Sequence, residues 1–571
     1  MPEHASASAG GQALAPQAWI CRVAPAAAGT PAVSSGALAG LSFAVKDNID
    51  TAGLPTTAGC PAFAYTPAVS AFAVQKLLDA GASLLGKTNL DQFACGLNGT
   101  RSPFGAVPNA LNPAYVAGGS SSGSAYVVAT GQVDFALGTD TAGSGRVPAG
   151  LNNIVGLKPS RGLISARGVV PAAQSVDCVS IFARTVATAV QVLESAMGHD
   201  VLDPYSRQLA LASESFPAAF HFGVPASLEF YGDSAAEAAF AEAVARLQSL
   251  GGMPVPIDFA PLAQVAALLY ESALVAERYT AVRSFFDTHE DEVIEPVRSI
   301  IAAGRAYSAA DLYAVQTELK RLGQQADVMW TGIDLLVVPT APTHYTIAQM
   351  RQDPVALNRK LGAYTNFVNL LDYAALSVPS AMRADGLPFG ITLIAPCGSD
   401  WQLAELGQRY HHATGLTQGA TGAPLPAMRP IAGIRKPATV KVAVVGAHLS
   451  GMPLNGQLTE RGATLVGAAE TAPHYRLFAL PGTTPPKPGL LRVAAGQGTR
   501  IALEIWDMPL GAYGSFVALV PAPLGIGTLE LGDGSTVQGF LCEAEALHAA
   551  QDISHLGGWR AYVASLKAAR L

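Results

Sequence analysis

The sequence predicts an α/β protein made of a large unit and a smaller one. Over residues 40–190, short apolar runs alternate with Gly-rich turns and Ala-rich helical stretches, which is typical of an α/β sheet. A stretch rich in Pro, Gly and Thr at 417–439 lacks hydrophobic periodicity, as linkers do. Roughly 130 residues follow it, which is enough for a second core. We therefore expect a first domain at 1–416, a linker at 417–439 and a second domain at 440–571.

The elements of the first domain follow from its apolar patterns. LSFAVKD (41–47) predicts a strand, and AFAVQKLLDAGASLLGK (71–87) predicts a helix, a Gly turn and a strand. Apolar positions at helical spacing continue across about 235–330, which we interpret as an antiparallel helical insertion with charged outer faces. VVPTAPT (337–343) and GITLIAP (390–396) predict that the sheet resumes after these helices.

The smaller domain has its own pattern of short elements. It opens with VKVAVVGAHL (440–449) and contains alternating runs, typical of strands, at 500–508 and 515–520. LGDGS (531–535) predicts a Gly turn, and the segment from Gly557 onward predicts a final helix. This mixture predicts a small α+β unit.

Composition excludes several classes of protein. With 50% hydrophobic and 13% charged residues, the chain is not intrinsically disordered. A net charge of −7 without a Lys/Arg cluster argues against nucleic-acid binding. We find no apolar run of about 18 residues and no signal peptide, so we expect no membrane association. The six cysteines form no C-x-x-C pair, and we expect a cytoplasmic protein without a metal site or a cofactor.

Two clusters of Gly and Ser stand out, GGSSSGS at 118–124 and GTDTAGSGR at 138–146. Taken alone, the first is typical of a linker, and without a following G-K-[S/T] it is no phosphate loop. Two such clusters around one apolar segment instead indicate a site. No His lies between His4 and His199, so a reactive Ser has no nearby His as base. Lys46, one of ten lysines, is either a strand-end Lys that reaches solvent or a buried base of lowered pKa.

Lys46 and the two clusters together resemble the amidase signature family. The spacings, 74 residues from Lys46 to Ser120 and 24 from Ser120 to Ser144, match that family, and the resemblance extends from about residue 18 to 415. It implies a mixed central sheet flanked by helices and no cofactor. It also implies that Ser144 is the nucleophile, that Ser120, after a cis Gly119–Ser120 peptide, relays the proton, and that Lys46 is the terminal base.

The second cluster also predicts an oxyanion hole. In a tight turn, consecutive backbone N–H groups can converge on one oxygen, and Gly143 permits close approach. The residues expected to donate are Thr141, Ala142, Gly143 and Ser144. We further expect Gly119 and Ser121 to contact the substrate. Arg146 is interpreted as the partner of Asp140 or another acid in a structural ion pair, and Ser122 and Ser124 as structural.

YESALVAER (270–278) bears on the substrate. A spacing of eight puts Tyr270 and Arg278 near one face of a helix, where they are either a half-buried Tyr and a surface Arg or a binding pair. The segment resembles the allophanate hydrolase branch of the family, in which the equivalent Tyr and Arg bind a small anionic substrate. A guanidinium fork matches a carboxylate. SAL precedes VAER here, where a Gly-Pro-Trp-like segment is usual.

The second domain resembles the extra domain of the same branch, which is itself similar to the γ-glutamyl cyclotransferase fold. The resemblance implies that allophanate loses ammonia at Ser144 and that the product, N-carboxycarbamate, is decarboxylated in the second domain. His448 is our candidate there, either as a proton donor or as a residue that caps a turn, and Glu504 either orients it or is structural. The alternatives are an amidase for another amide, including an aminoacyl-tRNA amidotransferase subunit, and a second domain that serves only assembly or regulation.

The resemblance also suggests partners. We expect a homodimer through the charged helical insertion and no nucleic-acid or membrane partner. The expected partners are a urea carboxylase or a triazine-pathway hydrolase, because urea carboxylation and triazine breakdown through biuret both supply allophanate. The sequence leaves this choice open.

Overall fold

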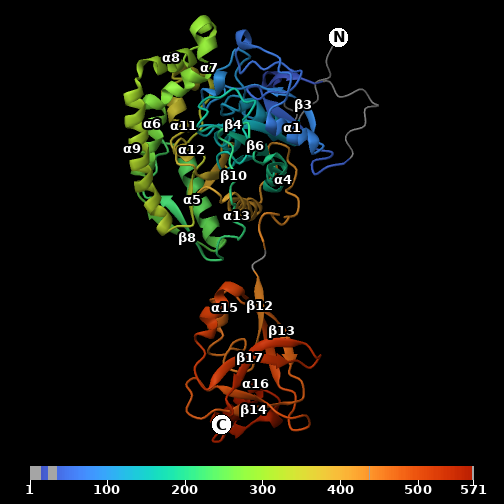
Figure 1. Ribbon diagram of the computed structural model, residues 1–571. Helices are drawn as coiled ribbons and strands as arrows, with labels where there is room; N and C mark the ends of the chain where they lie inside the picture. The colour runs from blue at the N-terminus through green and yellow to red at the C-terminus, as the bar shows by residue number, and fades with distance from the viewer. Residues whose placement is uncertain (1–13, 24–34, 436–437, 569–571) are drawn as a thin grey trace. The chain divides into compact units, whose positions relative to one another are not determined.

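A computed structural model describes residues 14–23, 35–435 and 438–568 of the chain. These residues form two compact units, which divide between Arg435 and Ala438 (Figure 1). The segment 417–435, expected to be part of a linker, belongs to the first unit: the Asn153 amide donates to the carbonyls of Thr417 and Gly419.

The first unit is built on one mixed sheet, which confirms the predicted fold class. Its order within the described residues is β1-β3-β2-β4-β6-β5-β10-β11-β9-β7-β8. The strands are β1 (Trp19–Arg22), β2 (Ser42–Lys46), β3 (Ser83–Thr88), β4 (Phe135–Asp140), β5 (Val155–Lys158), β6 (Cys178–Ala183), β7 (Phe220–Pro225), β8 (Gly252–Ile257), β9 (Leu335–Pro339), β10 (Ala374–Met382) and β11 (Pro388–Ala395). β2 runs parallel to both β3 and β4, whereas β6, β5, β10 and β11 run antiparallel to their neighbours.

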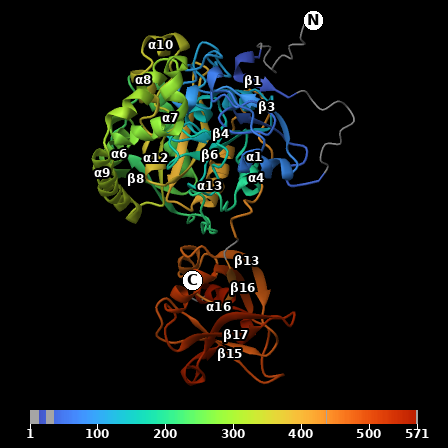
Figure 2. The ribbon, with the colours of Figure 1, turned by 45° about the horizontal axis from the view of Figure 1, so that its top comes forward.

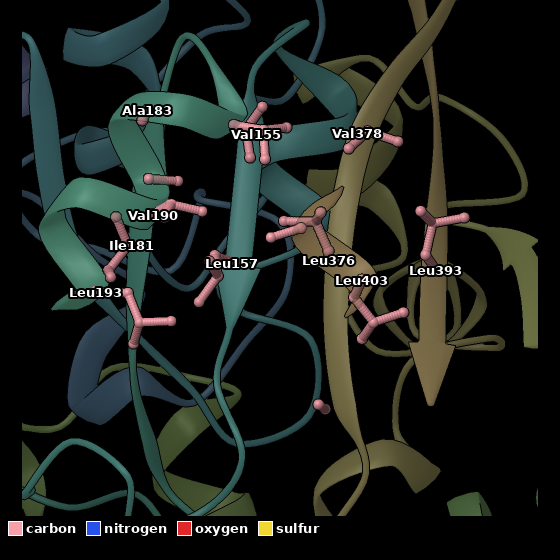
Figure 3. Packing of buried hydrophobic residues seen from close by; sticks show 14 of the residues in the cluster. Val155, Leu157, Ile181, Ala183, Val190, Leu193, Leu376, Val378, Leu393 and Leu403 are labelled. Atoms are coloured by element: carbon pink, nitrogen blue, oxygen red, sulfur yellow. The ribbon is translucent and has the colours of Figure 1, made fainter. Parts of the chain in front are cut away.

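Alternation along the strands divides the core between two faces. In β4, Phe135 and Leu137 join one cluster while Ala136 joins the other. One face is covered by α1 (Phe72–Asp79), α4 (Val186–Ala196), α5 (Ser234–Ser249) and α13 (Asp400–Ala413). Figure 3 shows how Leu193 of α4 and Leu403 of α13 pack onto this face. The other face is covered by α2 (Ser122–Ala129), α3 (Val147–Leu151), α6 (Ala260–Glu271), α9 (Ala309–Asp327) and α12 (Phe367–Leu370).

The helical region is shorter than predicted. Helices α6, α7 (Ala276–His289), α8 (Val297–Ala302) and α9 lie together on one side of the unit (Figures 1 and 2). The helical spacing predicted from 235 onward is confirmed in α5, but the helical insertion over 235–330 is wrong at 252–257, where β8 pairs in parallel with β7. Pro254 and Pro256 lie within β8, and prolines that only an edge strand tolerates conceal the strand in the sequence. Short helices complete the unit at α10 (Ile347–Gln352) and α11 (Ala356–Leu361).

The second unit has a separate core and two sheets. A five-stranded sheet has the order β13-β16-β12-β18-β17 and a three-stranded sheet the order β15-β14-β19 among the described residues. The strands are β12 (Thr439–Val444), β13 (Thr464–Glu470), β14 (Tyr475–Ala479), β15 (Pro488–Arg492), β16 (Ala502–Pro509), β17 (Leu524–Glu530), β18 (Thr536–Cys542) and β19 (Gln551–Asp552), and the helices are α14 (Gly456–Thr459), α15 (Leu510–Val517) and α16 (Trp559–Ala568). The alternating run at 515–520 does not form a strand. Its first residues belong to α15, in which Phe516 is the buried residue. The apolar alternation therefore does not mark the buried face of a strand. The likeness to the γ-glutamyl cyclotransferase fold stays a prediction.

Within the described parts of the chain, none of the helices has the length and apolar character needed to cross a membrane.

Candidate active site

Three side chains of the first unit form a continuous chain of hydrogen bonds. Lys46 ends β2, Ser120 precedes α2, and Ser144 lies in the turn between β4 and α3. Alternation puts Lys46 on the same face as Ala44, the face that α2 covers. Lys46 Nζ lies 2.8 Å from Ser120 Oγ, and Ser120 Oγ donates to Ser144 Oγ at 3.0 Å. The arrangement provides an unbroken path for a proton from Ser144 to Lys46.

Burial tunes the amine at the end of this path. Lys46 and Ser120 are fully buried, and Ser144 is 2% exposed. Burial disfavours the ammonium and lowers the pKa of Lys46 to about 7, although the charges of Asp91, Asp177 and Asp140 oppose the shift. The solvent-reaching alternative for Lys46 is therefore wrong. At neutral pH a substantial fraction of this amine is unprotonated and can accept a proton.

The carboxylate of Asp140 organises the turn that carries Ser144. It accepts hydrogen bonds from the N–H groups of Gly143 and Gly145, both at 2.9 Å, and from the Arg146 guanidinium at 2.8 and 2.9 Å. The predicted Asp140–Arg146 ion pair is confirmed. Gly143 has a φ of +135°, and a Cβ there would overlap the side chain of Thr365, so the turn requires glycine.

The same contacts narrow the predicted oxyanion hole. Because the N–H of Gly143 already donates to Asp140, the structure does not leave it free for a substrate oxygen. The N–H groups of Thr141, Ala142 and Ser144 have no acceptor among the described residues. These three are the better candidates for donors. The side chain of Thr141 donates to Asp177 at 2.5 Å and helps to hold the turn.

The cluster around Ser120 is tightly packed. The Gly119–Ser120 peptide is cis, and a Cβ on Gly119 would lie 2.6 Å from the backbone nitrogen of Gly99. The hydroxyl of Ser121, predicted to contact substrate, donates to the Thr139 carbonyl at 3.2 Å and is occupied there. Ser124 donates to the Leu137 carbonyl at 3.0 Å, which agrees with a structural role.

Tyr270 and Arg278 meet across a break between helices. The expectation that one helix carries both is wrong, since Tyr270 lies in the last turn of α6 and Arg278 in the first turn of α7, with a 3₁₀ turn at Ala273–Val275 between them. The Arg278 guanidinium nevertheless lies 5.3 Å from the centre of the Tyr270 ring. It is 5% exposed, and its Nε and Nη1 have no hydrogen-bond partner in the described part of the chain. A buried cation without an acidic partner is costly, and an anionic ligand removes that cost.

In the second unit, His448 lines a cavity of about 150 Å³. Its ring stacks on Phe540, with the centres 5.1 Å apart, and its Nε2 donates to Gln457 Oε1 at 2.9 Å. Burial, with a smaller effect from the charge of Lys487, lowers its pKa. Glu504 does not orient His448: it accepts from Ser450, Trp506 and Arg560 and is structural.

Comparison with known proteins identifies the family. The family model described as Amidase matches residues 19–404, which cover the sheet, both Gly/Ser clusters and Arg278. The chain belongs to this amidase family. A second model, described as the allophanate hydrolase C-terminal domain, matches residues 440–564 and thus the unit that carries His448. This amidase is accordingly an amidohydrolase with an added C-terminal domain.

Three relatives resemble this amidase along nearly its whole length. Urea amidolyase of Saccharomyces cerevisiae is 45% identical over 545 residues, which are 93% of this chain and 30% of that protein. The structure of Kluyveromyces lactis allophanate hydrolase is 41% identical with a TM-score of 0.78, covering 98% of this chain and 95% of that one. The structure of the K. lactis urea amidolyase is 42% identical with a TM-score of 0.79, covering 98% and 35%. The chain thus spans about a third of the urea amidolyases it matches.

Two residues of the amidase site escape sequence reasoning. Thr139 Oγ1 accepts a hydrogen bond from Lys46 Nζ at 2.6 Å, and Asp177 anchors Thr141. Thr139 lies inside GTDTAGSGR, but its contact with Lys46 arises because β2 and β4 are neighbours in the sheet. A prediction of that strand pairing is the signal that could have identified Thr139. Burial raises the pKa of Asp177 to about 6, while the charge of Arg278 opposes the shift. In the parts of the chain that the structure describes, no three His, Cys, Asp or Glu side chains are placed to hold a metal ion.

Proposed function

We propose that this amidase hydrolyses allophanate to ammonia and carbon dioxide in two steps. The observation that carries the proposal is the buried, unpaired Arg278 in the amidase unit. Allophanate is a small amide with one carboxylate, which can serve as the negatively charged partner of Arg278. The likeness to the K. lactis allophanate hydrolase, whose chain is covered over 95% of its length, supports the same substrate.

The first step takes place at Ser144. Neutral Lys46 accepts the proton of Ser120 while Ser120 accepts that of Ser144, whose oxygen attacks the terminal amide carbon. The N–H groups of Thr141, Ala142 and Ser144 stabilise the resulting oxyanion. The proton returns along the same path to the leaving nitrogen, the C–N bond breaks, and ammonia departs. Water then hydrolyses the acyl-enzyme to N-carboxycarbamate, with the relay acting again as base.

The second step takes place in the C-terminal unit. A bond from nitrogen to one carboxylate carbon breaks, carbon dioxide leaves, and the nitrogen keeps the electron pair and takes up one proton to give carbamate. Because Nε2 of His448 donates to Gln457, the neutral ring presents Nδ1 as an acceptor. A bound dianion favours protonation of that nitrogen, and the imidazolium then donates the proton. Carbamate breaks down to ammonia and carbon dioxide.

A substrate comparison tests the first step. Ammonia release is measured with allophanate, malonamate, urea and biuret side by side. We expect turnover of allophanate and binding of malonamate, which shares its carboxylate, and little turnover of neutral urea or biuret. Equal turnover of biuret and allophanate would overturn the proposal and favour an amidase for another small amide.

A variant tests the second step. His448→Asn should leave the first ammonia release unchanged and delay carbon dioxide release, followed by ¹³C NMR of labelled allophanate. The Asn side chain is smaller and cannot carry a proton to the nitrogen. If carbon dioxide appears at the normal rate, the alternative holds and the C-terminal unit serves assembly or regulation only.

The proposal extends to partners and place. The likeness to urea amidolyases, of which the chain spans about a third, supports association with a urea carboxylase that supplies allophanate. A homodimer through the helices of 260–327 and a cytoplasmic location are further parts of the proposal. Light scattering after size exclusion, with and without a urea carboxylase, measures both associations.

A further inference from the structure

The cavity beside His448 is lined by groups that suit an anion. Its polar side chains are His448, Gln457, Thr484 and Lys487, and its remaining lining is apolar or backbone. None of the lining residues is acidic, and Lys487 is the one lysine or arginine among them. A cavity of about 150 Å³ is smaller than the roughly 300–1,000 Å³ of pockets for drug-sized ligands. Its size and charge therefore suit a small anion.

Lys487 is held at this cavity by its backbone. Its N–H donates to Thr483 Oγ1 at 3.0 Å, and its carbonyl accepts from the N–H of Leu480 at 3.1 Å. The next residue, Pro488, begins β15. The side chain is half-buried, and Lys487 makes no ion pair within the described residues. These backbone hydrogen bonds fix the position of Lys487 at the cavity, and its side chain is available to a ligand.

The side chains of His448 and Lys487 line the same cavity. The charge of Lys487 is a minor cause of the lowered pKa of His448, after burial. Gln457 holds the His448 ring from the Nε2 side, so its other nitrogen is the one free to meet a ligand. A ring nitrogen that can take up a proton and a lysine side chain beside one small cavity complement a small anion.

We propose that Lys487 is the residue of the C-terminal unit that binds the carboxylate of a small dicarboxylate in the cavity beside His448. The inference rests on the proposed function for the identity of its natural ligand, N-carboxycarbamate. Lys487 fixes the carboxylate that stays on the product, and the second carboxylate faces the apolar lining. Loss of that charged carboxylate as neutral carbon dioxide is favoured where it is poorly solvated.

Binding of malonate tests the site without turnover, because its CH₂ group replaces the N–H of N-carboxycarbamate. The full chain carries Arg278→Ala, so that the first unit no longer offers its carboxylate partner, and calorimetry measures malonate affinity. We expect one site per chain, weakened at least tenfold by Lys487→Met. Lys441→Met is the matched control, since Lys441 is exposed on β12 outside the cavity lining. Unchanged affinity in Lys487→Met overturns the inference.

Turnover separates this inference from the proposed function. With ¹³C-allophanate, Lys487→Met should release the first ammonia at the wild-type rate and accumulate N-carboxycarbamate, while Lys441→Met should not. Lys487→Arg keeps the charge and should restore most of the carbon dioxide release. Carbon dioxide release at the normal rate in Lys487→Met overturns the inference. Absence of any ammonia release by the wild type overturns the proposed function, and the malonate affinities then still decide the role of Lys487.

Discussion

The two units place their polar side chains in different surroundings. In the first unit, Lys46, Ser120 and Ser144 are buried and bonded to one another at 2.8–3.0 Å. In the second, His448 and Lys487 are half-buried beside a cavity. Buried groups in a closed chain keep fixed geometry and shifted pKa values, which suits proton transfer. Half-buried groups beside a cavity can contact a ligand that enters it, so the first unit closes its polar groups into a hydrogen-bonded chain whereas the second leaves them open to a cavity.

The largest expected effect comes from the proposed nucleophile. Ser144→Ala removes the oxygen that attacks the amide, and we expect the first ammonia release to fall by about 10⁴-fold or more. Ser122→Ala is the matched control, because Ser122 is a buried serine of the other Gly/Ser cluster and its hydroxyl has no hydrogen-bond partner in the described chain. Residual activity of Ser144→Ala within about tenfold of the control would break the first half of the comparison.

The second prediction concerns pH and the buried amine. Only neutral Lys46 can accept a proton, and its pKa is about 7. The rate kcat/KM should therefore fall about tenfold per pH unit below 7 and level off above it. Lys46→Met should abolish this limb along with most of the activity. In Asp177→Asn the midpoint should move to lower pH, because the charge of Asp177 raises the pKa of Lys46. A limb unmoved by this change would assign it to another group.

Sequence reasoning found Ser120 and Ser144 because each lies in a compact Gly/Ser motif, and it found Lys46 because of its diagnostic spacing from them. The hydrogen bonds join Lys46, Ser120 and Ser144 as the amidase resemblance implied. Thr139 lies in the same motif but was missed, because its contact with Lys46 depends on how β2 and β4 pair. Motif spacing identifies the residues that the family motif contains. It does not identify side-chain contacts between strands, because those depend on which strands pair in the sheet.

Other features required the three-dimensional fold. Tyr270 and Arg278 were found, but for a wrong reason, since a turn between α6 and α7 joins them and not one helix face. The edge strand β8 was missed because its prolines conceal a strand, and the commitment of the Gly143 N–H to Asp140 is invisible to residue spacing. Periodicity describes regular elements well, and it fails at breaks, edges and turns.

The third prediction concerns the buried guanidinium of Arg278, whose Nε and Nη1 have no hydrogen-bond partner among the described residues. Arg278→Ala removes a charge-assisted contact to the carboxylate in both ground and transition states, so KM for allophanate should rise by about 100-fold with kcat nearly unchanged. Arg283→Ala, on the same helix but exposed and paired with Asp287, is the control. A fall in kcat without a change in KM would show that Arg278 acts in the chemical step and not in binding.

The smallest expected effect tests how closely the buried relay depends on its surroundings. The hydroxyl of Thr139 accepts a hydrogen bond from Lys46 at 2.6 Å, and Thr139→Val removes it while keeping the shape of the side chain. Losing one hydrogen bond of about 1 kcal/mol should lower kcat by about fivefold with KM unchanged. Because the lost oxygen stabilises the ammonium more than the amine, the pKa of Lys46 and the midpoint of the pH limb should also fall. A Thr139→Val enzyme with wild-type kcat and midpoint would show that Ser120 alone positions the amine. A lower kcat with an unmoved midpoint would mean that Thr139 orients Lys46 without tuning its charge.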